Sequence, residues 1–206
     1  MVAHEQGHAI LDSQRPEMNK TPDSKATHEA FADGVAFFNA LQQPEVREDT
    51  IRRWDDPNAS QSGLAANVGE EVLTYFGERP QTPGEGVRDL SGQARPGTPE
   101  AIGPHESGLQ FGTALHDATR EAYLELRRSN PELTAEAAYT QATEGVRSDF
   151  YRALDFLPPG GEITRDDLAA AMMRAISIDN NGARSENYRR HFEEAGLRPV
   201  TPDRVA

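Results

Sequence analysis

Two histidines near the start of the chain stand four residues apart, in the run His4-Glu5-Gln6-Gly7-His8. On an α-helix, residues four apart lie on the same face, so two imidazoles at this spacing can bind one Zn²⁺ ion from a single turn. Glu5 points to the side of such an ion, where a carboxylate can take a proton from a bound water molecule. The motif predicts a metal-assisted hydrolytic site. The alternative is a solvated polar helix face.

The chain has no Cys, so any metal ion must be held by His, Asp or Glu. Metzincins place a Gly three residues and a third His six residues after the second His, but Leu11 and Gln14 stand at those positions, which excludes that class. Glu29 comes 21 residues after His8, on a predicted helix, and Asp33 follows one turn later. We predict Glu29 as the third ligand and Asp33 as the hydrogen-bond acceptor of a ligand ring. An exposed acidic stripe is the alternative.

These pieces together resemble the thermolysin-like gluzincins, a family of zinc metallopeptidases. The resemblance is carried by HEQGH, by Asp12 four residues after His8, and by Glu29 with Asp33. It implies a bound zinc ion, Glu5 as general base, and Asp12 and Asp33 as residues that orient the ligands. The segment 29–32 (EAFA) is also similar to the Glu-x-Phe-Ala segment of the aminopeptidase gluzincins. Asp12 and a downstream His favour the thermolysin-like side.

Two further residues enter through the resemblance. The segment 104–108 (PHESG) is similar to a family segment in which a His precedes Asn-Ser-Gly, with one residue fewer here. The resemblance implies that His105 stabilises the oxyanion that forms during amide hydrolysis. The segment 87–90 (VRDL) resembles one in which an Arg binds the substrate carbonyl, which the fixed donor geometry of Arg88 suits. The alternatives are a His without a partner and a surface Arg. We assign no role to His28, His116 or His191.

The composition and net charge of the chain argue against two classes of binding partner. The chain has 206 residues, a formal net charge of -13 and 36% hydrophobic residues, and this charge argues against binding nucleic acid or anionic membranes. No apolar run approaches the length of a membrane span, and no signal peptide is visible. We therefore expect a modest core, and the resemblance implies a peptide or protein substrate. The compartment and the oligomeric state stay open.

The hydrophobic pattern predicts a mainly α fold with long irregular loops, and the resemblance implies that this is the helical C-terminal subdomain of a zincin-type metallopeptidase. No segment has a convincing strand pattern. Phe31, Val35, Phe38 and Leu41 follow the helical period in the second helix, which Asp23 or Ser24 can cap. The segment 79–106 is rich in Pro and Gly and is predicted to be irregular. The predicted helices are 2–13, 24–42, 44–54, 65–77, 107–128, 133–155, 165–177 and 185–195.

We expect the metallopeptidase core in residues 1–155 and a helical extension with a tail in residues 156–206. Members of the resembling family have a β-rich region before the active-site helix, whereas three residues precede His4. We therefore expect that the chain begins inside the enzyme and that its activity is impaired without the earlier region. The predicted function is zinc-dependent peptide-bond hydrolysis. The alternatives are a non-catalytic helical binding or scaffolding remnant and an aminopeptidase-like gluzincin.

Overall fold

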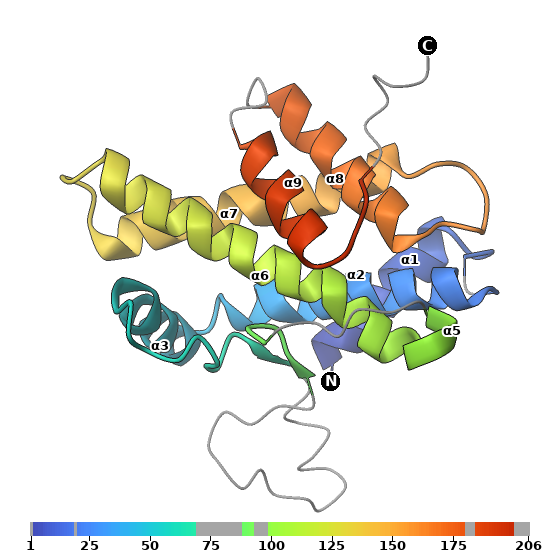
Figure 1. The fold of residues 1–206 in the computed structure, drawn as a ribbon, viewed down its shortest axis with the longest axis horizontal. Helices are drawn as coiled ribbons and strands as arrows, with labels where there is room; N and C mark the ends of the chain where they lie inside the picture. Colours follow the sequence, from blue (N-terminus) through green and yellow to red (C-terminus); the bar gives the residue numbers. More distant parts are fainter. Residues whose placement is uncertain (1, 19, 69–87, 93–98, 180–183, 200–206) are drawn as a thin grey trace, which may run out of the picture.

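The computed structural model describes residues 2–18, 20–68, 88–92, 99–179 and 184–199 (Figure 1). This part of the chain is mainly helical, which confirms the predicted α class. In chain order the elements are α1 (Val2–Gln14), α2 (Pro22–Ala40), α3 (Pro44–Asp55), β1 (Asn67–Val68), β2 (Arg88–Asp89), α5 (Pro99–Ile102), α6 (Pro104–Ser129), α7 (Ala135–Arg152), the 3-10 helix η1 (Ala153–Phe156), α8 (Arg165–Asp179) and α9 (Ser185–Glu194).

Helix α2 is the central element, and it packs most extensively against α6 and α1. The four apolar residues predicted for its core face are all buried, with at most 3% of their surface exposed. Phe31 stacks on Phe150 of α7, with ring centroids 4.8 Å apart. One side of α2 is thereby fixed in the core, and another side lies against α1.

The start of α2 is fixed by a capping box rather than by the predicted caps. The hydroxyl of Thr21 accepts a hydrogen bond from the Ser24 backbone, and the Ser24 hydroxyl accepts one from the Thr21 backbone. The prediction of Asp23 or Ser24 as N-cap was wrong, because Pro22 already occupies the first helical turn. Proline is favoured in the first turn because backbone N–H groups there have no hydrogen-bond acceptor within the helix, so the N–H that proline lacks is not needed.

Two glycines let the neighbouring helices approach α2 closely. A Cβ atom on Gly7 of α1 would lie 2.5 Å from Cα of Ala32, and one on Gly108 of α6 would lie 2.9 Å from Cβ of Glu29. Both distances are too short for real side chains. The absence of a side chain at these two positions therefore sets how near α1 and α6 come to the middle of α2.

The predicted helix 65–77 was wrong where the structure describes it. Residues 67–68 form β1 and pair antiparallel with β2, with Asn67 opposite Asp89. The N–H of Leu90 continues this pairing by donating to the Ala66 carbonyl, and the Leu90 side chain is buried. A pairing partner about twenty residues away overrides a local helical pattern of this kind. The remainder of the predicted helix lies outside the described residues.

The predicted irregular segment 79–106 is partly helical. It contains α5, and α6 begins at Pro104 rather than at residue 107, so His105 lies in the first turn of α6. The other predicted helices are confirmed within a few residues. In Figure 1, α6 crosses the molecule diagonally, with α8 and α9 above it, and α9 packs on α6. In the ranges that the structure describes, no helix combines the length and the apolar character needed to cross a bilayer.

Candidate metal centre

Three side chains from α1 and α2 converge at the crossing of these helices: His4, His8 and Glu29. Nε2 of His4 lies 3.0 Å from Nε2 of His8. The Glu29 carboxylate lies 3.4 Å from Nε2 of His4 through Oε2, and 3.6 Å from Nε2 of His8 through Oε1. Within the described ranges, this is the group whose ligand atoms, all within 4.8 Å of one another, could hold a metal ion.

These separations match the distances between ligand atoms in a tetrahedral zinc site. Ligand atoms about 2.0–2.1 Å from a tetrahedral zinc ion lie roughly 3.3 Å from one another. The separations of 3.0, 3.4 and 3.6 Å lie near that length, with a different oxygen of the Glu29 carboxylate facing each histidine. Two imidazoles and one carboxylate are also a donor set that hydrolytic zinc sites use, with the fourth position left for water or substrate. The residues present therefore fit a zinc ion in both chemistry and spacing.

The protonation states at neutral pH also suit metal binding. Burial lowers the pKa of His8, with His4 and His28 acting in the same direction and Glu29 against it. Burial alone would raise the pKa of Glu29, but the hydrogen bond from His4 and the charges of the nearby histidines lower it to about 2. A metal ion requires a neutral imidazole and an ionised carboxylate. His8 and Glu29 already hold those forms.

A second layer of polar groups surrounds the three candidate ligands. Nδ1 of His4 lies 2.9 Å from Oδ1 of Asp33, whose side chain is fully buried. Nδ1 of His8 lies 2.8 Å from Nδ1 of His28, and Nε2 of His28 lies 3.3 Å from Oδ1 of Asp12. The predicted position of Asp33 beside a ligand ring agrees with this geometry. Asp12 approaches the site through His28, to which the sequence had given no role.

Glu5 is exposed on α1 beside His8, where its negative charge opposes the lowering of the His8 pKa. Glu5 comes three residues before His8 on α1, and residues three apart are neighbours on a helix surface. A carboxylate on the same helical turn as two candidate metal ligands has the chemistry of a general base toward metal-bound water, and this role of Glu5 stays a prediction.

His105 lies at the edge of the site and contacts Glu29. Its Nδ1 is 2.7 Å from Oε2 of Glu29, and 68% of its side chain is exposed. The contact follows from the early start of α6, which Pro104 at the first helical position could have indicated. The backbone of Arg88 belongs to β2. Its side chain lies outside the described part of the structure, so its predicted role stays a prediction.

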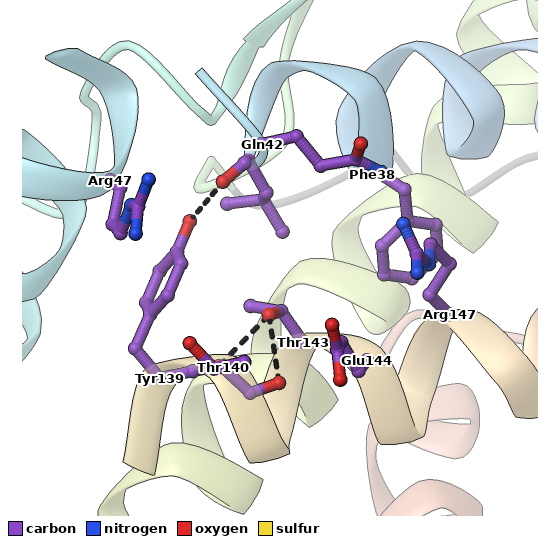
Figure 2. Close-up of a pocket in the computed structure, with 9 residues that line it drawn as sticks. Phe38, Gln42, Arg47, Tyr139, Thr140, Thr143, Glu144 and Arg147 are labelled. Carbon is purple, nitrogen blue, oxygen red and sulfur yellow. Dashed lines mark hydrogen bonds between the residues drawn. The ribbon is translucent and has the colours of Figure 1, made fainter. Parts of the chain in front are cut away.

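The remaining histidines lie elsewhere. His116 is buried in α6, with Nδ1 3.0 Å from Asp117. His191 of α9 faces Glu121, 2.6 Å away. A cavity of about 290 Å³ opens near the far end of α2, and Figure 2 shows Arg47 and Arg147 on opposite sides of it. None of the described residues that line this cavity belongs to the His-His-Glu group.

Three residues of the site were missed from the sequence. Gly7 and Gly108 control the helix approach, and His28 links His8 to Asp12. The position of His28 directly before Glu29 was visible, but its partner could be identified only once the two helices were placed against each other.

Comparisons with known proteins gave no relative for this chain: no protein-family model, no curated protein and no solved structure matches it.

Proposed function

We propose that this chain is the helical, zinc-binding part of a gluzincin-type metallopeptidase and that it hydrolyses peptide bonds. The observation that carries the proposal is the convergence of His4, His8 and Glu29, with ligand-atom separations of 3.0 to 3.6 Å. The i, i+4 histidines with a Glu between them add a general base to the same helical turn. A zinc ion at this point would polarise the substrate carbonyl and acidify water.

The residues around the ligands have separate roles in this proposal. Glu5 accepts a proton from water and passes it to the leaving amine. Asp33 holds the His4 ring so that Nε2 faces the ion. His105 stabilises the developing oxyanion. Because Nδ1 of His105 faces the Glu29 carboxylate, its Nε2 can donate to substrate only when the ring carries both protons. Arg88 is the proposed partner of the substrate carbonyl.

The test is metal content and peptide hydrolysis of the purified chain and of Glu5→Gln. The variant should retain one zinc ion per chain and lose hydrolysis by at least about 100-fold, since a general base contributes roughly that factor or more. Glu48→Gln, an exposed residue on α3, is the matched control and should retain both. Iron in place of zinc, equal hydrolysis in Glu5→Gln, or a wild-type chain that binds no zinc would each contradict the proposal.

One contact favours a second candidate, a non-catalytic zinc site that stabilises a binding or scaffolding protein. Nδ1 of His105 lies close to the ligand carboxylate, and four protein ligands make a closed structural site. The variant His105→Ala separates the two. If His105 is a fourth ligand, its loss should weaken zinc binding as severely as His8→Ala does. If His105 is instead an oxyanion donor, its loss should leave zinc binding intact and lower only the hydrolytic rate.

The aminopeptidase-like alternative rests on the similarity of segment 29–32 and predicts an acidic anchor for the substrate amine. Blocked and free peptides distinguish it from the endopeptidase proposal. Cleavage that requires a free amino terminus would favour the aminopeptidase class, and cleavage of peptides with acetylated ends would favour the endopeptidase class.

A further inference from the structure

His28 is a buried polar ring between α1 and α2, with 2% of its surface exposed. Its Nδ1 lies 2.8 Å from Nδ1 of His8, and the two ring planes differ by 24°. Its Nε2 is buried without a well-aligned hydrogen-bond partner among the described residues, and the nearest carboxylate oxygen is Oδ1 of Asp12 at 3.3 Å. The Asp12 side chain is 57% exposed. His28 thus stands between a candidate metal ligand and a carboxylate at the surface.

The protons of this chain of contacts can be placed from chemistry alone. A neutral imidazole carries one N–H, and a carboxylate only accepts. If Nε2 of His8 binds a metal ion, its proton is on Nδ1 and is donated to Nδ1 of His28. The proton of His28 must then be on Nε2, facing Asp12. The reverse arrangement would put a proton on Nε2 of His8, which would prevent that atom from binding a metal.

We infer that His28 is a positioning residue that, supported by Asp12, holds His8 in the tautomer whose Nε2 is free to bind the metal ion. The inference rests on the proposed zinc site. It gives the two ligand rings different supports: His4 faces the carboxylate of Asp33 directly, and His8 faces that of Asp12 through a second imidazole. Groups that orient metal-binding histidines in this way tune ligand basicity and metal affinity.

A purely structural role for His28, as a ring packed between two helices, makes a different prediction. Zinc affinity is measured by competition with a chromophoric chelator for wild type, His28→Leu and His28→Asn. Leu fills the space without polar atoms. Asn places an amide oxygen near the position of Nδ1, where it can accept from His8, but it is too short to reach Asp12. The thermal midpoint of each metal-free protein reports packing separately.

We expect His28→Leu to weaken zinc binding by roughly 10- to 100-fold, the usual effect of losing a group that orients a ligand. His28→Asn should recover most of this loss, and Asp12→Ala should have an effect in wild type but none in the His28→Leu background. His116→Leu, at an equally buried histidine of α6, should leave zinc affinity unchanged. Equal zinc affinity in wild type and His28→Leu, or equal losses for Leu and Asn, would overturn the inference.

The ring nitrogens give a second readout that packing would not produce. In the zinc-loaded protein, long-range ¹H–¹⁵N correlation spectra should show the proton of His8 on Nδ1 and that of His28 on Nε2. A proton on Nδ1 of His28 would overturn the inference while leaving the zinc site standing. A wild-type chain that binds no zinc would overturn both, since His28 would have no metal ligand to position.

Discussion

Two clusters of histidine and carboxylate side chains in this molecule use the same residue types with different results. The α1–α2 cluster consists of His4, His8 and Glu29. The α6–α9 cluster consists of Glu121, His191, Glu194 and Arg190. In the second, Nε2 of His191 lies 2.6 Å from Glu121 and Nδ1 lies 3.3 Å from Glu194. Arg190 also pairs with Glu121.

The difference lies in where the ring nitrogens point. Both nitrogens of His191 already face carboxylates, and the Arg190 guanidinium supplies the positive charge that these carboxylates need. In the α1–α2 cluster, one nitrogen of each ring faces a supporting group and the other nitrogens face each other and Glu29. Two ring nitrogens and a carboxylate that face one point form the donor set that a metal ion needs, and a proton shared between the two rings is the alternative. The two clusters therefore share residue types, but among the described residues it is the His4, His8 and Glu29 group whose ligand atoms converge closely enough to hold a metal ion.

The largest contrast should appear in zinc content. His8→Ala removes one of the converging nitrogens and should abolish stoichiometric zinc binding at neutral pH. His191→Ala breaks the other cluster and should leave one zinc ion per chain. Metal analysis after dialysis measures both. Equal zinc content in the two variants would show that the α1–α2 cluster does not bind zinc in preference to the α6–α9 cluster.

A smaller effect is expected from the carboxylate behind His4. Asp33→Asn keeps a side chain of the same shape but removes the charge that the His4 ring faces, and it should weaken zinc binding by roughly 10- to 100-fold. The matched control is Asp117→Asn, because Asp117 contacts the ring of His116, 3.0 Å away, outside the site. Chelator competition gives the two affinities. A loss of affinity in Asp117→Asn as large as in Asp33→Asn would contradict the local role of Asp33.

Two glycine substitutions compare the packing at the α1–α2 crossing with the packing of α7 against Arg184. A Cβ on Gly7 would meet Cα of Ala32 at 2.5 Å, whereas one on Gly145 of α7 would meet the flexible end of Arg184 at 2.7 Å. Both changes to Ala improve helix propensity equally. Gly7→Ala should lower the free energy of unfolding by about 1–3 kcal/mol, as overpacking does, and should weaken zinc binding because α1 is displaced. Gly145→Ala should cost less in urea denaturation, because its Cβ would meet the end of a side chain rather than the backbone. The reverse order would contradict the close helix crossing.

The smallest effect concerns pH. The pKa of His8 is lowered by burial and that of Glu29 is about 2. At His8, a lowered pKa means that protons compete with zinc only below the ordinary histidine range. Zinc affinity should therefore stay nearly constant from about pH 8 to about pH 6.5 and fall below that. Calorimetric titrations at several pH values measure this, and a steep fall already between pH 8 and 7 would contradict the assigned protonation of His8.

Much of the site follows from local spacing in the sequence. The i, i+4 relation brings His4 and His8 to one face of any helix that forms there, and the capping sequence and apolar period define α2. Glu29 and Asp33 were found because they recur at helical spacing in a family-like segment. Each of these relations lies within a single helix and needs no knowledge of the fold.

The relations that the sequence did not reveal all join separate elements. The contact of His28 with His8 depends on the angle at which α1 crosses α2, and that angle depends on Gly7 meeting Ala32. Residues 67–68 pair with residues 88–89, and neither segment has a local sequence pattern that indicates the other as its partner. Such contacts are decided by packing, which one-dimensional periodicity does not encode.

The most direct test of the zinc site is X-ray diffraction from zinc-soaked crystals, measured on both sides of the zinc absorption edge. We predict one strong anomalous peak at about 2.0–2.1 Å from Nε2 of His4 and Nε2 of His8 and within coordination distance of the Glu29 carboxylate. A strong peak at the α6–α9 cluster instead, or no peak between the two α1 histidines and Glu29, would contradict the account.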